Sequence, residues 1–480
     1  MDLLTYDPGE GPCFWEAIRS LPGYAPGEVI RLRQMVFESD AVLRLPEVLA
    51  AAGARSDSPL LVVMDTTAMR RGRDDLKPFV RAILGRAGWA VEPQIANPDA
   101  AGQVHTELEQ IGQVQSRLSA GCAVLALGSG TITDIAKHAC HRFEEASGFA
   151  VPLVVYQTAN SVSAYTSNMA PTFVDGVKRT LPSRYPDALV CDLETLRDAP
   201  YTMTAAGVGD LLAAGVSFAD WYLAHSLGLD ATHTPLAETL MGPLDRTLLE
   251  LAAGVRARDL AAMGVLAKLI ALAGLAMSLS HATTPLWGFE HVFSHVLDMA
   301  AEARHEPLGM HGAQVAVAAL HTADAYEIFL REFEPVEFDR AGSFPDPDRM
   351  RTRVKDAFAS IDASGRVAEE CWTDYSVRPE AWRREAARIP GRLADWQAIR
   401  TELARRAWPA ETMRQVMRGV GLPQTFRELA PPISEAEARK AFLTAHWIRR
   451  RFTLGDLLLF MGWDREALWT RLSGAGAHAA

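Results

Sequence analysis

The stretch AVLALGSGTITDIAK, at residues 123–137, decides the fold of this chain. Ala123–Leu127 is wholly apolar, as expected of a strand that is buried on both faces of a sheet. The strand runs directly into Gly128-Ser129-Gly130, where glycine lets the backbone approach a ligand, and Ile135 starts a helix. A helix N-terminus at this place offers free N–H groups and the positive end of a dipole to a phosphate. Because many strand-to-helix turns carry glycine for steric reasons alone, the turn by itself leaves both interpretations open.

Other apolar runs place this strand in a larger sheet. Strands are predicted at Leu60–Met64, Trp89–Ile95, Val151–Tyr156 and Ala188–Asp192, with helices up to about Arg86 and over Ala101–Leu118. Strands that alternate with helices at this spacing indicate a parallel, Rossmann-like α/β sheet. We therefore assign residues 60–198 to a dinucleotide-binding α/β domain. Residues 1–59 give weak signals and are predicted to be an N-terminal extension with short helices.

After about Pro200 the pattern changes to helices. Helical composition and length are found at Ala205–Ser226, Leu248–Ser280 and Glu435–Phe460, and helices joined by long loops are predicted over Glu332–Glu428. The predicted fold is therefore a Rossmann-like α/β N-terminal domain plus an all-α C-terminal domain, which spans residues 199–480.

Composition narrows the class of protein. A net charge of −11 argues against nucleic-acid binding, although one basic pocket would suffice for a small anionic substrate. The five cysteines are scattered and odd in number, which favours a reducing compartment, and the first residues lack the layout of a signal peptide. The uncharged run between Lys268 and Glu290 contains Ser, His, Thr and Pro, so we expect a buried helix and a turn there. We expect a cytoplasmic protein with a small-molecule substrate, no nucleic-acid partner and no membrane span. Whether the chain forms a homo-oligomer stays open.

Three further features of the α/β half have two interpretations each. Thr158 and Ser161, which follow a predicted strand, either contact a cofactor or cap a helix. Asp65, at the end of the first predicted strand, either accepts hydrogen bonds from an adenosine ribose, which favours NAD over NADP, or is a turn aspartate. Asp134 and Lys137, three residues apart, could form a simple surface ion pair.

The helical half contains side chains of the kinds that bind metals. Gly207-Val-Gly-Asp210 sets a carboxylate at the predicted start of a helix. His291 and His295 are four residues apart, so both imidazoles fall on one helix face, and His311 lies in a glycine-flanked turn. Two imidazoles and a carboxylate can bind Zn, Fe or Ni and leave open positions for a substrate oxygen. The alternative is that Asp210 caps a helix and the histidines are satisfied core residues.

In their order and spacing, these motifs resemble glycerol-1-phosphate dehydrogenases, which are cousins of iron-containing alcohol dehydrogenases, glycerol dehydrogenase and dehydroquinate synthase. The resemblance is carried by Gly128–Lys137, Thr158–Ser161, Ala199–Asp210, Glu290–His295 and His311–Gly312, and by Ile448–Asp456, which is similar to the family's closing helix. The fold that the resemblance implies is dehydroquinate synthase-like.

The resemblance also implies a site. Asp210, His291 and His311 would bind one divalent metal ion (Zn, Ni or Fe), and the catalytic residues would be Asp210 and His295, which lies against the substrate. The cofactor would be NAD(H) or NADP(H), with NAD favoured. Its implied contacts are Asp65, Gly128, Ser129, Gly130, Thr131, Ile132, Thr158 and Ser161. The implied activity is a metal-dependent NAD(P) dehydrogenase that interconverts a small ketone and a secondary alcohol, either dihydroxyacetone phosphate and sn-glycerol 1-phosphate or a close analogue.

Two positions depart from the family pattern. Ser129 replaces a glycine, which the turn tolerates if Ser129 needs no positive φ. Ser163 stands where the family has an aspartate that contacts substrate, so the identity of the ketone stays open. Lys178 is either a phosphate anchor or a solvated loop lysine.

Two alternative functions are kept. One is a dehydroquinate-synthase-like carbocyclic lyase with the same metal and NAD, which would need several basic residues at the site. The other is a non-catalytic binding homologue.

Overall fold

The computed structural model describes residues 4–25, 27, 29–100, 102–174, 176–335 and 346–475. They form two compact units. The first takes in the chain up to Val174 together with Lys178–Leu211 and Pro235–Leu279, and the second takes in the other described residues. The domain boundary that the sequence suggested at residues 198 and 199 stays a prediction.

A six-stranded parallel sheet is the centre of the first unit, with the order β1-β10-β7-β6-β2-β5. The strands are β1 Gln34–Glu38, β2 Leu60–Met64, β5 Val91–Ile95, β6 Ala123–Gly128, β7 Leu153–Gln157 and β10 Ala188–Asp192. Counted along the chain from β2, the order β5-β2-β6-β7-β10 is 2-1-3-4-5, which is that of a doubly wound α/β sheet. The predicted fold class is confirmed.

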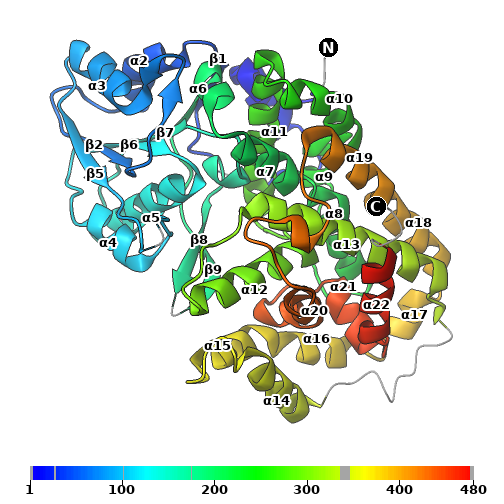
Figure 1. The fold of residues 1–480 in the computed structure, drawn as a ribbon. Coiled ribbons are helices and arrows are strands. Elements are labelled where there is room, and N and C mark those ends of the chain that lie inside the picture. Colours follow the sequence, from blue (N-terminus) through cyan, green and yellow to red (C-terminus); the bar gives the residue numbers. More distant parts are fainter. Residues whose placement is uncertain are drawn as a thin grey trace. The chain divides into compact units, whose positions relative to one another are not determined.

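Helices cover both faces of this sheet, which explains why the central strands β2 and β6 carry no polar side chain. Figure 1 shows α2 and α3 on one side of the sheet and α4 and α5 on the other. On the α2–α3 side the core includes Leu60, Val62, Leu125 and Tyr156, which alternate along their strands as side chains of one face must. A strand buried on both faces satisfies its polar backbone groups through its neighbours in the sheet.

The remaining elements of the first unit are short helices, two small hairpins and one long apolar helix. The helices are η1 Pro8–Glu10, α1 Pro12–Arg19, η2 Ala41–Arg44, α2 Leu45–Ala51, α3 Leu76–Arg86, α4 Leu108–Gln115, α5 Gly130–Ser147, η3 Ser163–Tyr165, α6 Leu193–Asp198, α7 Tyr201–Leu211, α9 Leu236–Met241, α10 Leu244–Arg256 and α11 Leu260–Leu279. The hairpins pair β3 Arg70–Arg71 with β4 Asp74–Asp75, and β8 Met169–Val174 with β9 Val177–Pro182.

The second unit is built from helices. They are α8 Ala214–Ser226, α12 Phe289–Ala303, α13 His311–Glu332, α14 Pro347–Phe358, α15 Arg366–Tyr375, α16 Val377–Glu385, α17 Ile389–Leu393, α18 Trp396–Arg406, α19 Ala410–Val420, η5 Phe426–Glu428, α20 Glu435–Thr444, η6 Ala445–Ile448, α21 Leu454–Phe460 and α22 Arg465–Ala475.

One buried carboxylate joins four of these helices. Asp220 of α8 accepts hydrogen bonds from the Tyr326 hydroxyl of α13 (2.5 Å), from the Phe289 N–H at the start of α12 (2.9 Å) and from the Leu454 N–H at the start of α21 (2.9 Å). Burial and the nearby carboxylate of Glu290 raise the pKa of Asp220 to about 7. The start of α12, which carries the predicted histidine motif, is therefore bonded to α8 and, through Asp220, connected to α13 and α21.

The structure differs from the sequence-based expectation in several elements. Residues 1–59 contribute β1, an edge strand paired with β10, in addition to the expected short helices. The predicted helix at 248–280 is divided, because Arg258 adopts a positive φ of 56° between α10 and α11. The predicted helix at 435–460 is likewise divided into α20, η6 and α21. Of the region 332–428, residues 336–345 lie outside the described chain and the rest is largely helical.

Within the described part of the chain, two stretches are long and apolar enough to cross a membrane, residues Tyr201–Ser226 and Leu260–Leu279. Within the protein, 89% and 78% of their most apolar windows are buried, as in the core helices of a soluble protein. The cytoplasmic location stays a prediction.

Candidate active site

The predicted nucleotide-binding residues gather at one edge of the sheet. β2, β6 and β7 are neighbours, and Asp65, Gly128 and Thr158 lie at or just beyond their carboxyl ends. Gly128 is in register with Gln157, and the Thr158 N–H donates to the Gly128 carbonyl (3.2 Å). Between β2 and β6 the chain reverses its direction of winding, and ligands of doubly wound sheets bind at such a switch point.

The turn after β6 is shaped for close approach. Ser129 has a φ of −82°, so the serine in place of the family's glycine costs no strain, as the sequence analysis required. A Cβ at Gly130 would overlap Val162, and one at Gly128 would lie 2.6 Å from the side chain of Ile132, so neither position admits a larger residue without a shift. The helix α5 begins at Gly130, five residues earlier than expected, and no side chain caps its N-terminus. Thr131 and Ile132 therefore lie in the first turn of α5, where N–H groups can face a phosphate.

Asp65 has local partners as well as a position at the switch point. Its carboxylate accepts hydrogen bonds from the Thr67 N–H (3.1 Å) and hydroxyl (2.9 Å), as a turn aspartate does. It also forms an ion pair with Lys77 (2.8 Å), whose ammonium donates to the Asp65 and Thr67 carbonyls as well. A cation therefore stands beside the group that was expected to repel the 2′-phosphate of NADP.

The loop after β7 does not use its hydroxyl groups as helix caps. The N-cap position of η3 is Val162, and it makes no side-chain capping hydrogen bond. Thr158 and Ser161 are both buried, and the Ser161 hydroxyl lies 3.1 Å from the Tyr165 hydroxyl, which itself donates to the Ala159 carbonyl (2.7 Å). The capping interpretation is therefore wrong for these two residues.

Asp134 and Lys137 do not form a surface pair, contrary to the simple interpretation of their spacing. Both are buried, with 2.9 Å between the carboxylate and the ammonium, and burial raises the pKa of Asp134 to about 6. The Lys137 ammonium also donates to the carbonyls of Ala164 (2.6 Å) and Met169 (2.8 Å). This lysine thus fastens α5 to the segment that carries Ser163.

Asp210 lies near the end of α7, not at the start of a helix as the sequence analysis expected. It is buried and accepts a hydrogen bond at Oδ2 from the Ser163 N–H (2.9 Å). A Cβ at Gly207 would overlap the Asn160 carbonyl, so the glycine one turn earlier lets α7 lie directly against the loop after β7. The expectation was wrong because glycines before an aspartate are also typical of close helix packing.

The three predicted histidines of the second unit lie together. His291 and His295 share a face of α12, and His311 is the first residue of α13. The ring centroids of His291 and His311 are 5.3 Å apart, and those of His295 and His311 are 5.7 Å apart. His291 and His295 are buried and His311 is partly exposed.

Oxygen atoms of neighbouring residues contact Nδ1 of two of these imidazoles. The carboxylate of Glu290 lies 2.9 Å from Nδ1 of His291 and accepts a hydrogen bond from its N–H. Nδ1 of His311 lies 3.1 Å from the Ser294 hydroxyl, which donates its own hydrogen to Gln314 Oε1 (2.8 Å) and so accepts from the imidazole. Oxygen partners of this kind, which fix the tautomer and orientation of an imidazole, are typical of metal-binding histidines.

His295 has the opposite arrangement. Nη2 of Arg449 lies 3.0 Å from Nδ1 of His295, and a guanidinium can only donate, so Nδ1 accepts and Nε2 of the neutral ring carries the hydrogen. In this tautomer Nε2 of His295 can donate a hydrogen bond, and it has no lone pair with which to bind a metal. Sequence reasoning missed Arg449, which is 154 residues from His295, although the run Arg449-Arg450-Arg451 was visible in the closing motif.

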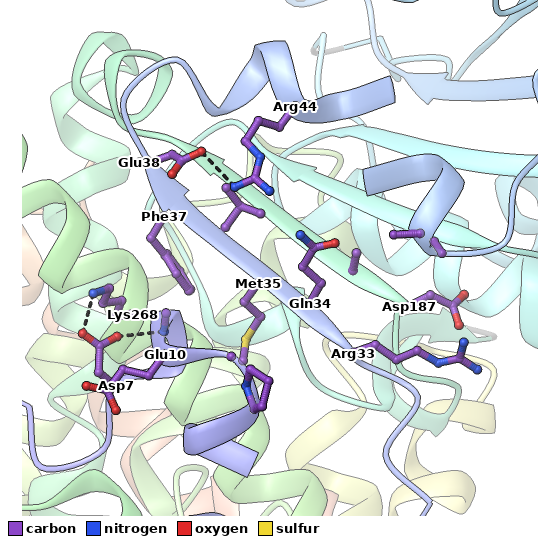
Figure 2. Close-up of a pocket in the computed structure, with 17 residues that line it drawn as sticks. Asp7, Glu10, Arg33, Gln34, Met35, Phe37, Glu38, Arg44, Asp187 and Lys268 are labelled. Carbon is purple, nitrogen blue, oxygen red and sulfur yellow. Dashed lines mark hydrogen bonds and ion pairs between the residues drawn. The ribbon is translucent and has the colours of Figure 1, made fainter. Parts of the chain in front are cut away.

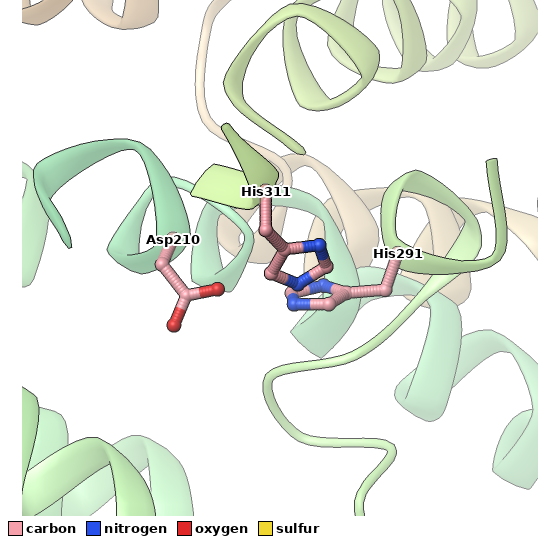
Figure 3. Close-up of side chains that lie close together, drawn as sticks. All are labelled: Asp210, His291 and His311. Carbon is pink, nitrogen blue, oxygen red and sulfur yellow. The ribbon is translucent and has the colours of Figure 1, made fainter. Parts of the chain in front are cut away.

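One ligand atom from each of Asp210, His291 and His311 lies within 4.8 Å of the others. Figure 3 shows these three side chains. A carboxylate oxygen and two imidazole nitrogens in largely buried surroundings fit a divalent ion such as Zn, Ni or Fe. The three residues predicted to bind the metal thus lie close together, and their binding of an ion stays a prediction.

A separate pocket of about 600 Å³ lies along β1, and Figure 2 shows its lining. Its charged groups include Asp7 and Lys268, which form an ion pair (2.6 Å), and Arg44, which pairs with Glu38 (3.2 Å). None of the predicted site residues lines this pocket, so its lining adds nothing to the site.

Comparisons with known proteins place the chain among dehydrogenases. A family described as "Iron-containing alcohol dehydrogenase" matches residues 36–200. The "Glycerol-1-phosphate dehydrogenase [NAD(P)+]" of Bacillus licheniformis is 32% identical over 330 residues, which are 69% of this chain and 66% of the relative. The protein of the same name from Bacillus subtilis is 29% identical over 58% of this chain and 70% of its own length. For other relatives of that name the match spans about half of the relative.

Solved structures share the fold at low sequence identity. An NADH-dependent butanol dehydrogenase from Thermotoga maritima superposes with a TM-score of 0.56 at 14% identity, over 94% of this chain and 98% of that one. This similarity supports the order and packing of the elements and carries no information on substrate.

Proposed function

Since this chain belongs to the iron-containing alcohol dehydrogenase family, whose members are NAD(P)-dependent dehydrogenases, we propose that it is a metal-dependent enzyme that interconverts a small ketone and a secondary alcohol. The names of its glycerol-1-phosphate dehydrogenase relatives favour dihydroxyacetone phosphate and sn-glycerol 1-phosphate, or a close analogue. The observation that supports this function best is the difference in tautomer among the three histidines. Two present Nε2 as a ligand atom and the third presents Nε2–H as a donor.

Each residue has a distinct role in this proposal. Asp210, His291 and His311 would hold the ion, which when bound supplies Lewis-acid polarisation of a substrate oxygen, while NAD(P)H supplies the hydride. Glu290 and Ser294 hold the two imidazoles in the orientation that binding requires. His295 donates a hydrogen bond through Nε2–H to an oxygen of the substrate, and because its ring is neutral, the proton that the alkoxide takes up comes from bound water.

The first α/β unit positions the nucleotide in this proposal. The turn Gly128–Gly130 admits the pyrophosphate to the uncapped start of α5, and Thr158 and Ser161 line the neighbouring strand end. Asp65 lies across the switch point from this turn, where an adenosine ribose binds in doubly wound sheets. NAD is the favoured cofactor.

The direct experiment measures NADH and NADPH oxidation by the purified protein, supplied separately with Zn, Ni or Fe. The ketones are dihydroxyacetone phosphate, dihydroxyacetone and other small ketones. We expect net, metal-dependent oxidation with at least one of them. No oxidation with any ketone in any metal form would refute the proposal.

The same assay separates the lyase alternative, which gains some support from the two arginines near the histidines, Arg449 and Arg451. A carbocycle-forming lyase oxidises and re-reduces its substrate within one turnover, so it would leave the NADH concentration unchanged. Net oxidation of NADH would exclude it.

A further inference from the structure

The segment after η6 folds onto the histidine face of α12. Arg449 contacts Nδ1 of His295 (3.0 Å), and the guanidinium of Arg451 donates to the Trp287 carbonyl and to the Thr283 hydroxyl (2.7 Å). The Trp287 ring in turn stacks on His291, with 5.4 Å between centroids. Two arginines of this segment therefore reach the immediate surroundings of the candidate site, although neither is near it in sequence.

Arg451 is a cation whose two hydrogen-bond partners are both neutral. Among the residues that the structure describes, it forms hydrogen bonds with a carbonyl and a hydroxyl and no ion pair. Burial and the nearby charge of Arg449 lower the pKa of Arg451 to about 9, so the group is still charged at pH 7. A guanidinium such as that of Arg451, with only neutral hydrogen-bond partners, is costly to enclose unless an anion joins it.

The guanidinium of Arg451 also has donors to offer. An arginine carries five N–H donors in a planar fork, and two nitrogens account for the bonds to Trp287 and Thr283. A forked set of N–H donors matches the oxygens of a phosphate and binds them in pairs.

We propose that Arg449 and Arg451 bind the phosphate group of the substrate beside His295. The inference rests on the proposed function, which already favours a phosphate monoester, and it adds which side chains hold the phosphate. Arg449 then serves two groups, because it holds the tautomer of His295 and attracts the anionic end of the substrate. From the sequence, Lys178 was one candidate for the phosphate anchor. In the structure Lys178 is half-buried in β9, with its ammonium 5.7 Å from the Phe173 ring centroid, so the solvated-loop interpretation is wrong.

The test compares Arg449→Gln and Arg451→Gln with a matched control, Arg450→Gln. Arg450 lies between them in sequence, but its side chain is 67% exposed and pairs with Asp374 (3.0 Å). Binding of inorganic phosphate to the metal-loaded protein is measured by calorimetry. We expect the first two changes to weaken it by about tenfold or more each, as for loss of a charge-assisted pair, and the control to leave it unchanged.

Steady-state kinetics give the second readout. The KM for dihydroxyacetone phosphate should rise by a similar factor in Arg449→Gln, while dihydroxyacetone, which has no phosphate, should be affected far less. Arg449→Lys should recover part of the phosphate affinity, because it keeps the charge and loses the fork.

Three results would overturn the subsite. One is no phosphate binding by the native protein, another is equal weakening in Arg450→Gln, and the third is equal loss on both ketones with unchanged phosphate binding, which would mean that Arg449 acts only through His295. Failure of the proposed function has a different signature. Native protein that binds phosphate through Arg449 but oxidises NADH with none of the ketones in any metal form would refute the function and retain the subsite.

Discussion

At the scale of single residues, the chemistry depends on what each histidine nitrogen contacts. Glu290 accepts from Nδ1 of His291, and Arg449 donates to Nδ1 of His295. Because these two partners have opposite charge, the two imidazoles of one helix face present opposite functions at Nε2. The partner, more than the histidine itself, determines the role.

Glu290→Gln should lower metal affinity. The amide retains an oxygen near His291 but loses the negative charge that makes the imidazole a better ligand, and loss of such a partner typically costs about 10- to 100-fold in affinity. Equilibrium dialysis with Zn measures the change. Glu302→Gln, on the same helix about three turns away, is the control and should bind normally. Equal affinity in Glu290→Gln and native protein would remove Glu290 from the metal site.

Asp65→Ser should shift cofactor preference toward NADP(H). The change removes repulsion of the 2′-phosphate and frees the ammonium of Lys77 to attract it, which together should alter the ratio of kcat/KM values by about tenfold or more. The double variant Asp65→Ser/Lys77→Ala should lose part of that gain. An unchanged cofactor ratio in Asp65→Ser would place this carboxylate away from the ribose.

Ser163→Asp tests the departure from the family pattern. The Ser163 backbone N–H donates to Asp210, so a carboxylate here would lie close to the proposed metal-binding group and could accept a substrate hydroxyl. Such a charge-assisted bond is worth about 1.5–3 kcal/mol, so kcat/KM for dihydroxyacetone phosphate should rise about tenfold or more, while the Kd for NADH stays constant. A low KM in the native protein and a neutral Ser163→Asp change would show that the departure carries no specificity.

At the scale of elements, the strand–turn–helix unit of β6 and α5 links sequence to function. The buried strand delivers the turn to the carboxyl edge of the sheet, and Lys137 holds α5 against the segment that includes Ser163. Close packing of the turn against Val162 explains why glycine occupies position 130.

Gly130→Ala should weaken NADH binding and lower stability. The added Cβ would overlap the Val162 side chain, and overpacking of this kind costs about 1–3 kcal/mol of unfolding free energy. Gly112→Ala in α4 is the matched control, because no atom lies near its added Cβ, and it should stabilise by about 0.4–1 kcal/mol. Thermal unfolding and fluorescence titration with NADH measure both effects. A Gly130→Ala protein with native stability and NADH affinity would contradict the packing argument.

The elements also show what the sequence could predict. The central strands were recognisable because burial on both faces requires continuous apolar runs, and the strand Ala188–Asp192 was predicted at its observed bounds. β1 and β9 were missed, since an edge strand with Gln34 and Glu38 and a hairpin strand with Lys178 and Arg179 lack that pattern. Ion pairs such as Lys77 with Asp65, and the contact of Arg449 with His295, were beyond prediction because they depend on how distant segments fold together.

At the scale of the whole molecule, the predicted site residues are spread along the chain from Asp65 to His311. The α/β unit carries the nucleotide-binding edge, and the helical unit carries the histidines and the two arginines. The proposed reaction needs both a nucleotide and a metal, so removal of either should stop turnover without unfolding the chain.

The most direct test of metal-dependent dehydrogenase activity is a metal titration of chelator-stripped protein, followed by NADH oxidation with the best ketone. We predict that activity returns in proportion to added metal, up to one ion per chain. His291→Ala and His311→Ala should neither bind nor recover, since two protein ligands hold a divalent ion poorly. The exposed His305, outside the cluster, should be replaceable by Asn, which also adopts its positive φ of 55°. Full turnover by the stripped protein, or by His291→Ala without bound metal, would contradict a metal-dependent dehydrogenase.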